Sequence, residues 1–212
     1  MHSSQMAPHF LSICRRICAK GLVVGSGGNA SLLCSDGILI TPSGISLEVL
    51  EEKDLVLLQP DGSYTCPAGH VPTKEWKMHL ACYTARDDVK AIVHVHSIHA
   101  LAVSCLEGAD PACAIPVYTA SYGGLVGALP LLPYHKPGSD ELCSCVAAAI
   151  RENSALLLAN HGSLAAAKTL DSALNTVDEI EGQAKLHLLL GGRGRPLTPA
   201  QLAQLNPQGR WG

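Results

Sequence analysis

The chain has 212 residues, 47% of them apolar, which is enough to bury a substantial core, and its length favours one large domain over two. The formal net charge is -3 with 16% charged residues, so we predict no binding to nucleic acid or to a membrane surface. A local basic pocket for a small anion is compatible with this charge. The sequence shows no leader pattern and no apolar run of membrane-spanning length, and we therefore expect a cytoplasmic protein.

Nine cysteines, an odd number, are scattered through apolar segments and form no C-x-x-C pair. This distribution is typical of reduced, buried thiols and favours neither a zinc ribbon nor a redox pair. Because only 4% of the residues are aromatic, we expect a core of small side chains that these cysteines help to fill.

Hydrophobic periodicity and turn residues predict the order of the secondary-structure elements. The chain is expected to begin with a helix that ends at Gly21, followed by two hairpins that turn at Asp36-Gly37 and Asp61-Gly62. A short helical turn at residues 46–54 separates the hairpins. The expected helices lie at residues 10–22, 72–86, 97–108, 139–153 and 169–192. The expected hairpins lie at residues 25–44 and 55–66, and the other expected strands at residues 89–97 and within residues 154–167, where a buried strand ends in a turn.

This mixture of hairpins and helices predicts an α/β fold in which helices cover a largely antiparallel sheet. No internal repeat divides the sequence, and we expect a single domain over residues 1–212. The tail from about residue 192 is rich in Pro, Gly and Gln, so we expect it to be mobile.

The segment "LVVGSGGNA", residues 22–30, satisfies the G-x-G-x-x-A pattern of dinucleotide binding. A dinucleotide fold needs a helix directly after these glycines, whereas the next residues predict a hairpin, and the cofactor interpretation is rejected. The glycines and Asn29 can direct backbone N–H groups and an amide towards an anion. A tight turn with positive φ explains the same stretch equally well.

The segment "IVHVHSIHA", residues 92–100, places His94 and His96 two residues apart on a predicted strand. Side chains at i and i+2 share one face of a strand, so the two imidazoles converge. A single histidine there is explained by a hydrogen bond to the backbone or to a carboxylate. Two desolvated imidazoles side by side are costly unless they share a proton, a carboxylate or a metal, and this pair favours a metal.

His161 follows the predicted buried strand, and Glu75 lies near the start of the predicted helix 72–86. Three histidines and one carboxylate would suit tetrahedral Zn²⁺, one per chain, although Mn²⁺, Co²⁺ or Ni²⁺ also accept these ligands. His79 and His99 are expected to support this site from outside or to pack in the core. The other histidines, which lack convergent partners, are His2, His9, His70, His135 and His187.

Two short motifs place hydroxyl groups where anions bind. "TPSG" at residues 41–44 predicts a turn and "TKE" at residues 73–75 a helix start, where free N–H groups favour a phosphate. Lys74 adds a positive charge. Taken separately, each motif is explained as a turn or a helix cap.

The motifs "GNAS", "ITPSG", "KEWKMH", "HVHS" and "ANHG", in this order, resemble the class II aldolase/adducin family from about residue 11 to residue 190. The resemblance implies a three-layer α/β/α fold with a central, largely antiparallel sheet, assembled as a homotetramer with active sites between subunits. It implies that His94, His96 and His161 hold Zn²⁺, and that Glu75 is a ligand or the acid/base.

The resemblance also implies a phosphate site and a catalytic tyrosine from a neighbouring subunit, whose expected place Tyr118 and Tyr122 flank. Aldolases of the family carry two serines where this chain has Thr73 and Lys74, which predicts an additional anionic group or a different phosphate pose. The residues implied for the phosphate site are Gly28, Asn29, Thr41, Gly44, Thr73 and Lys74.

Among family members, the motifs are most similar to those that decarboxylate 3-oxo-tetronate 4-phosphate to dihydroxyacetone phosphate and CO₂ through a metal-stabilised enediolate. The alternative is an aldolase acting on a sugar phosphate such as L-fuculose phosphate, or a related epimerase or dehydratase, because these reactions share the enediolate. A non-catalytic adducin-like module predicts loss of the metal ligands, and all four are present. The expected substrate is a small phosphorylated sugar acid.

Overall fold

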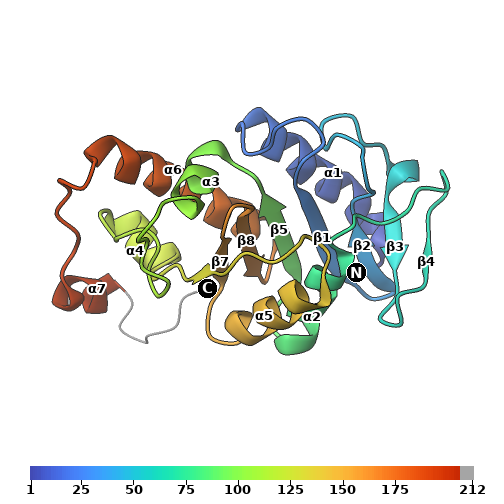
Figure 1. Cartoon of the computed structure of the whole chain (residues 1–212). Coiled ribbons are helices and arrows are strands. Elements are labelled where there is room, and N and C mark those ends of the chain that lie inside the picture. Colours follow the sequence, from blue (N-terminus) through green and yellow to red (C-terminus); the bar gives the residue numbers. More distant parts are fainter. Residues whose placement is uncertain (206–212) are drawn as a thin grey trace.

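The computed structural model of the protein describes residues 1–205, and residues 206–212 lie outside this range. Its centre is an eight-stranded sheet with the strand order β4-β3-β2-β1-β5-β8-β7-β6 (Figure 1). Neighbouring strands in the described part of the chain are antiparallel, except for the parallel pair β6 and β7. The strands are β1 Asn29–Cys34, β2 Gly37–Ile40, β3 Val56–Leu58, β4 Tyr64–Thr65, β5 Ala91–Val95, β6 Leu131–Leu132, β7 Ala155–Leu158 and β8 Gly162–Ala167.

Helices cover both faces of this sheet, so the mixed α/β fold with a central, mostly antiparallel sheet is confirmed. Helices α1, α3 and α6 lie over one face and α2 and α5 over the other, while α4 and α7 lie beyond the β6 end (Figure 1). The helices are α1 Ser3–Ala19, the 3-10 turn η1 Glu52–Asp54, α2 Trp76–Ala85, α3 Ile98–Ser104, α4 Ala120–Leu125, α5 Asp140–Ile150, α6 Leu170–Leu190 and α7 Pro199–Leu205.

Strand β5 lies near the middle of the sheet and is buried along its whole length. Val93 and Val95 pack into the core formed with α1 and α6, whereas Ile92 packs into the core formed with α2 and α5. Since alternate residues of a strand point to opposite faces, His94 shares the face of Ile92 and points towards α2. The predicted strand thus presents a histidine to the layer that contains Glu75.

Several elements differ from the sequence-based expectations. The first helix begins at Ser3 rather than near residue 10, and the segment 154–167, where a single strand was expected, is the hairpin β7–β8. The Asp36-Gly37 turn is confirmed, because Cys34 pairs with Gly37. The short elements α4 and β6 were not expected, since six and two residues show too little periodicity to be recognised.

The C-terminal segment is partly described. Helix α7 packs against α4, and Leu202 joins the apolar cluster that contains Tyr122. The rest of the tail lies outside the described residues, so its mobility and the single domain over residues 1–212 stay predictions. No helix within residues 1–205 is long and apolar enough to cross a membrane.

Phe10, the one phenylalanine of the sequence, lies fully buried in α1 and anchors this helix to the core. Phe10→Ala should lower the free energy of unfolding by about 3–5 kcal/mol, because the lost apolar contact is accompanied by a cavity. Urea denaturation measures this loss. Val49→Ala, at a side chain that is 64% exposed, is the control and should change stability by less than about 0.5 kcal/mol. A loss at Phe10 no larger than at Val49 would show that α1 does not depend on this contact.

Candidate active site

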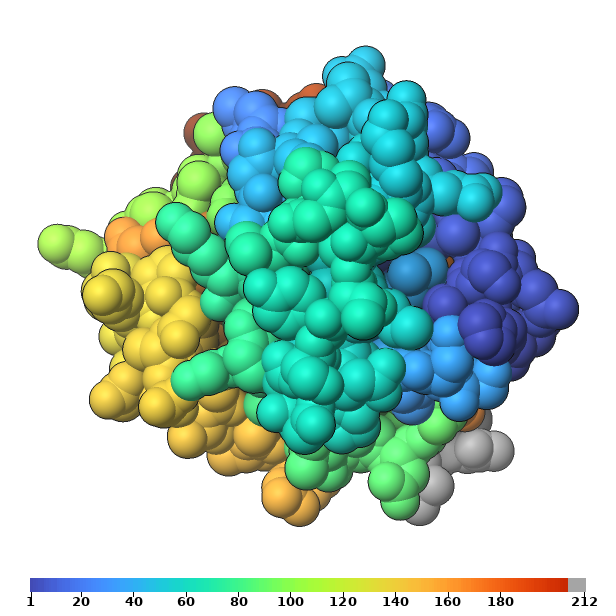
Figure 2. Space-filling view, turned by 90° about the vertical axis from the view of Figure 1, so that its right-hand side faces the viewer, coloured from blue at the N-terminus to red at the C-terminus, as the bar shows by residue number. Residues whose placement is uncertain are grey.

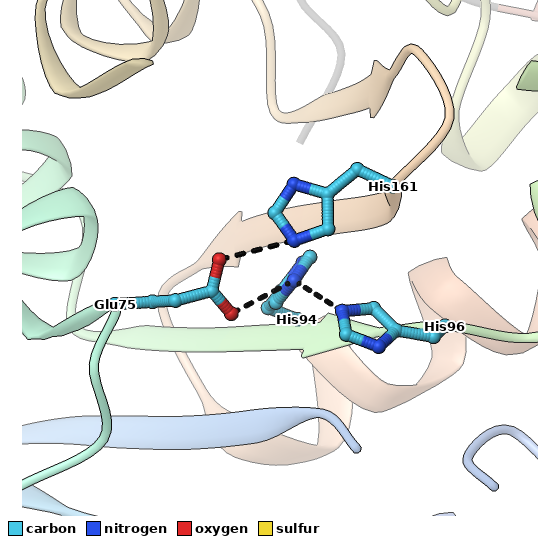
Figure 3. A group of neighbouring side chains, drawn as sticks. All are labelled: Glu75, His94, His96 and His161. Atoms are coloured by element: carbon cyan, nitrogen blue, oxygen red, sulfur yellow. Dashed lines mark hydrogen bonds and ion pairs between the residues drawn. The ribbon is translucent and has the colours of Figure 1, made fainter. Parts of the chain in front are cut away.

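Four side chains from separate parts of the chain converge at one end of β5 (Figure 3). His94 lies on β5, His96 directly follows it, and His161 lies in the turn between β7 and β8. β8 pairs with β5, with Ser163 opposite Val95, so this turn is held beside the end of β5. Glu75 is the residue before α2, and its carboxylate contacts His94 and His161.

The potential ligand atoms of these four residues all lie within 4.8 Å of one another. The Nε2 atoms of His94 and His96 are 2.9 Å apart. Glu75 Oε2 is 3.2 Å from His94 Nε2, and Glu75 Oε1 is 3.1 Å from His161 Nε2. The sequence-based prediction that Glu75, His94, His96 and His161 come together is therefore met by the geometry.

The hydrogen bonds of this cluster leave a place for a cation. His94 Nδ1–H donates to the carbonyl oxygen of Ser163 at 2.9 Å, so the lone pair on Nε2 points into the cluster. That lone pair faces His96 Nε2 at 2.9 Å and Glu75 Oε2 at 3.2 Å, while Glu75 Oε1 faces His161 Nε2. Such a set of acceptors is unfavourable in a buried site unless a positive charge lies among them.

Burial and the neighbouring imidazoles control the charge of the ligands. Burial, together with His94 and His161, lowers the pKa of His96 to about 3, so this imidazole is neutral and its lone pair is available. Burial would raise the pKa of Glu75, but His94 and His161 outweigh it and hold that pKa well below its usual range. Burial would lower the pKa of His94, but the carboxylate of Glu75 outweighs it and raises that pKa. Three imidazoles, which bind metals in their neutral form, and one carboxylate fit a divalent metal such as zinc.

Two glycines make room for the histidines. A side chain at Gly162 would meet the carbonyl oxygen of Val95 and lie 2.8 Å from His96 Cδ2. Gly28 has a φ of +76°, and a side chain there would lie 3.0 Å from the carbonyl oxygen of His94. The close approach of backbone to the cluster thus explains a glycine directly after His161 and another directly before Asn29.

A cleft of about 330 Å³ opens onto the cluster and brings together five of the six residues implied for the phosphate site. The sixth, Thr41, is buried behind the cleft, where its Oγ accepts a hydrogen bond from the N–H of Ala30. Sequence reasoning did not assign Pro137 to the site, although its segment "LPLLPYHKPG", residues 129–138, is similar to family members; Ser26 and Ser43 lie within the motifs discussed above. The cleft is lined by Ser26, Gly27, Gly28, Asn29, Pro42, Ser43, Gly44, Thr73, Lys74, Glu75, His96, Pro137 and His161.

Figure 2 views the molecule from the β4 end of the sheet. The turquoise chain that carries β4 and leads into α2 covers the centre of this face, with α1 in dark blue on one side. The yellow chain around residues 130–145 lies on the other side and includes Pro137 of the cleft. Segments that are distant in the sequence thus make up this face of the molecule.

The structure places the two expected tyrosines away from the cleft of their own chain. Tyr122 is completely buried in the core between α4 and α6, and its hydroxyl finds no hydrogen-bond partner within the described chain. The hydroxyl of Tyr118 lies 3.0 Å from Nδ1 of His187, and the two rings stack. Their catalytic role stays a prediction.

The remaining histidines stay outside the cluster. His79 is completely buried and contacts Asn29, whereas His99 and the N–H groups of α3 bind the carboxylate of Glu181. His70 is half-buried, and its Nε2 lies 3.1 Å from Oδ1 of the buried Asp54. The expectation that His79 supports the site from outside agrees with its place next to Asn29.

A mixed α/β fold with a His₃/Glu site beside a polar cleft is typical of a metal-dependent enzyme. Comparison with known proteins identifies the family to which it belongs. The chain matches the family described as Class II Aldolase and Adducin N-terminal domain over residues 9–188. The 3-oxo-tetronate 4-phosphate decarboxylase of Escherichia coli strain K12 is 39% identical over 188 residues, which cover 88% of each chain.

Two further matches agree with this family. The L-fuculose phosphate aldolase of Escherichia coli strain K12 is 37% identical over 188 residues, covering 89% of this chain and 85% of the aldolase. The crystal structure of YgbL from Klebsiella pneumoniae has a TM-score of 0.91 at 36% identity and covers 97% of this chain and 100% of YgbL. The chain belongs to the class II aldolase/adducin family and is a metal-dependent lyase of that family.

Proposed function

We propose that the protein decarboxylates 3-oxo-tetronate 4-phosphate. In this reaction the C1–C2 bond breaks, C1 leaves as CO₂, and the electron pair moves through C2 onto the carbonyl oxygen at C3. Protonation at C2 then gives dihydroxyacetone phosphate. The substrate carries two anionic groups, a phosphate and a carboxylate, and the cleft must accommodate both.

The observation that carries this proposal is Lys74 at the start of α2, in the cleft that also contains Glu75 and His96. An ammonium group beside the free N–H groups of a helix start attracts an anion, and the glycine turns at Gly28 and Gly44 line the same cleft. The 39% identity to the decarboxylase of Escherichia coli supports the same substrate.

The family implies one Zn²⁺ per chain, held by His94, His96 and His161. A divalent metal bound there supplies Lewis-acid stabilisation of the negative charge that develops on the substrate. Glu75, which lines the cleft and contacts the histidines, is the residue we propose to move the proton of the C2 hydroxyl or to protonate C2. The homotetramer implied by the family is part of the proposal.

The amide of Asn29 and the hydroxyl of Thr73 are the groups we propose to orient the substrate between the metal site and the phosphate site. Both residues line the cleft, and Asn29 Nδ2 also donates to Glu75 Oε2 at 2.9 Å. Holding the substrate by its phosphate and its oxygens aligns the C1–C2 bond and excludes water from the reacting atoms.

The proposal is tested with zinc-loaded full-length protein and 3-oxo-tetronate 4-phosphate, by measuring dihydroxyacetone phosphate and CO₂ together. Equal amounts of both products, lost with a chelator and restored by zinc, are the expected result. Light scattering of the same sample tests the homotetramer.

The competing function is aldol cleavage, which the 37% identity to the L-fuculose phosphate aldolase favours. The same protein is therefore incubated with L-fuculose 1-phosphate. Dihydroxyacetone phosphate with an aldehyde and without CO₂, together with no reaction on the sugar acid, would replace the decarboxylase proposal by the aldolase.

Lys74→Ala is expected to weaken binding of the phosphorylated substrate more than it slows turnover. A hydrogen bond to a charged group contributes about 1.5–3 kcal/mol, so KM should rise about tenfold or more while kcat changes little. Lys77→Ala, at an exposed lysine of α2 that pairs with Asp140, is the matched control. Equal kinetics of the two variants would assign Lys74 to the protein surface.

A further inference from the structure

A row of buried polar side chains runs from Glu75 into the protein, away from the cleft. Asn29 Nδ2 lies 2.9 Å from Glu75 Oε2, and Asn29 Oδ1 lies 2.5 Å from His79 Nε2. On the other side of the imidazole, His79 Nδ1 lies 2.7 Å from Ser31 Oγ, which in turn lies 2.7 Å from the hydroxyl of Tyr83. The row joins the carboxylate of the site to residues that no substrate can reach.

The spacing of these residues explains how two elements build the row together. Glu75, His79 and Tyr83 are four residues apart along α2 and its start, whereas Asn29 and Ser31 are two residues apart on β1. Four residues of helix rise about 6 Å and two residues of strand about 6.6 Å, so the two sets stay in step. This match places each polar group of α2 opposite a polar group of β1.

The row is almost completely shielded from water. His79 and Ser31 are fully buried, and Asn29 is 4% exposed. Burial, with a further contribution from His94, lowers the pKa of His79 to about 3, so the imidazole is neutral and carries one N–H and one acceptor nitrogen. Asn29, Ser31 and His79 must therefore find their partners within the row, whereas the hydroxyl of Tyr83 also lies 3.5 Å from the carbonyl oxygen of Lys90.

These constraints give the hydrogen bonds a single direction. An ionised Glu75 only accepts, so Asn29 must present its NH₂ group to Glu75 and its oxygen to His79. His79 then needs its proton on Nε2, which leaves Nδ1 to accept from the hydroxyl of Ser31. Ser31 in turn accepts from Tyr83. The opposite tautomer would place two acceptors against each other at Asn29 or at Glu75.

We propose that His79, held in the Nε2–H tautomer by Ser31, is a positioning residue that fixes the amide of Asn29 and thereby the carboxylate of Glu75. The inference rests on the proposed role of Glu75 in proton transfer. His79 touches neither substrate nor metal. Without it, the amide of Asn29 is free to turn its oxygen towards Glu75, and the resulting repulsion would move the carboxylate away from the reacting atoms.

The tautomer is measured directly by ¹⁵N NMR of the histidine rings in full-length, zinc-loaded protein, with His79→Gln used to assign the signals of His79. We expect a protonated Nε2 and an unprotonated Nδ1. Ser31→Ala removes the donor to Nδ1 and should increase the population of the other tautomer. A wild-type imidazolium, or an Nδ1–H tautomer, would overturn the inference. This measurement needs no substrate, so its result does not depend on whether the proposed decarboxylation is correct.

The kinetic test compares two replacements of His79 at saturating zinc, on whichever substrate the wild-type protein turns over. His79→Leu removes both polar atoms and should lower kcat about 10- to 100-fold with little change in KM. His79→Gln keeps a donor and an acceptor on one side chain and should recover most of the lost kcat. Zinc content should stay the same in both variants.

Cys82→Ala is the control for packing, because Cys82 is also fully buried in α2 but packs towards α5. It should lower stability without lowering kcat. If His79→Leu kept the wild-type kcat, or if His79→Gln were as slow as His79→Leu while equally stable, the positioning role would be wrong. If His79→Leu does not fold, the comparison of His79→Gln with Ser31→Ala decides the matter: Ser31→Ala should be the slower.

Discussion

Purified His96→Ala protein is expected to lose bound zinc and turnover together. His96 Nε2 lies 2.9 Å from His94 Nε2, and its neutral imidazole is one of three nitrogen donors in the cluster. Replacing residues that only support metal ligands already costs about 10–100-fold, so removing a ligand should reduce zinc affinity by more than about 100-fold. Metal analysis after dialysis and a turnover assay measure the two losses.

The control for this variant is His70→Ala, which removes a half-buried histidine that contacts Asp54 and lies outside the metal-ligand cluster. It should keep one zinc per chain and normal turnover. Full zinc occupancy and normal activity in His96→Ala would show that His96 is not a ligand, and the pair of histidines on the β5 face would then require another explanation.

Glu75→Gln is expected to separate chemistry from metal binding. Glutamine has nearly the same shape as glutamate, and its amide oxygen can still accept the hydrogen bond from Asn29. Three histidines are enough to hold a catalytic zinc, so the metal should stay. Because glutamine cannot accept or donate the transferred proton, kcat should fall about 10²- to 10⁴-fold.

The variant is compared with Glu141→Gln, an exposed glutamate at the start of α5. Zinc content and kcat of both proteins are measured at saturating metal and substrate. A Glu75→Gln protein with zinc bound and a kcat within about twofold of wild type would exclude Glu75 from proton transfer. Loss of zinc along with activity would instead make Glu75 mainly a metal ligand.

Much of the site could be predicted from short-range spacing in the sequence. The spacing of two from His94 to His96 directs both side chains to one strand face, and this holds wherever the strand lies in the fold. The glycines beside Asn29 and the helix start that follows Thr73 and Lys74 also act locally, through backbone conformation and free N–H groups. The motifs together indicated the family, and with it the α/β/α architecture that the structure confirms.

Other features depended on which segments pair in the folded chain. His161 joins the cluster because β7–β8 is a hairpin whose second strand pairs with β5, although the sequence predicted a single strand there. Tyr118 and Tyr122 lie near the expected place in the sequence, yet packing of α4 against α6 buries Tyr122 and directs Tyr118 to His187. Neither outcome follows from local periodicity.

The row from Glu75 to Tyr83 shows why the spacing of residues could be predicted from the sequence and the packing of distant segments could not. Residues spaced by four on a helix and by two on a strand were visible in the sequence, but neither pattern says which helix covers which strand. That choice is made by burial of apolar surface over the whole chain, where α2 and α5 share one core and α1 and α6 another. Local spacing decides which way a side chain points on its own element, and only the packing of distant segments decides what it meets.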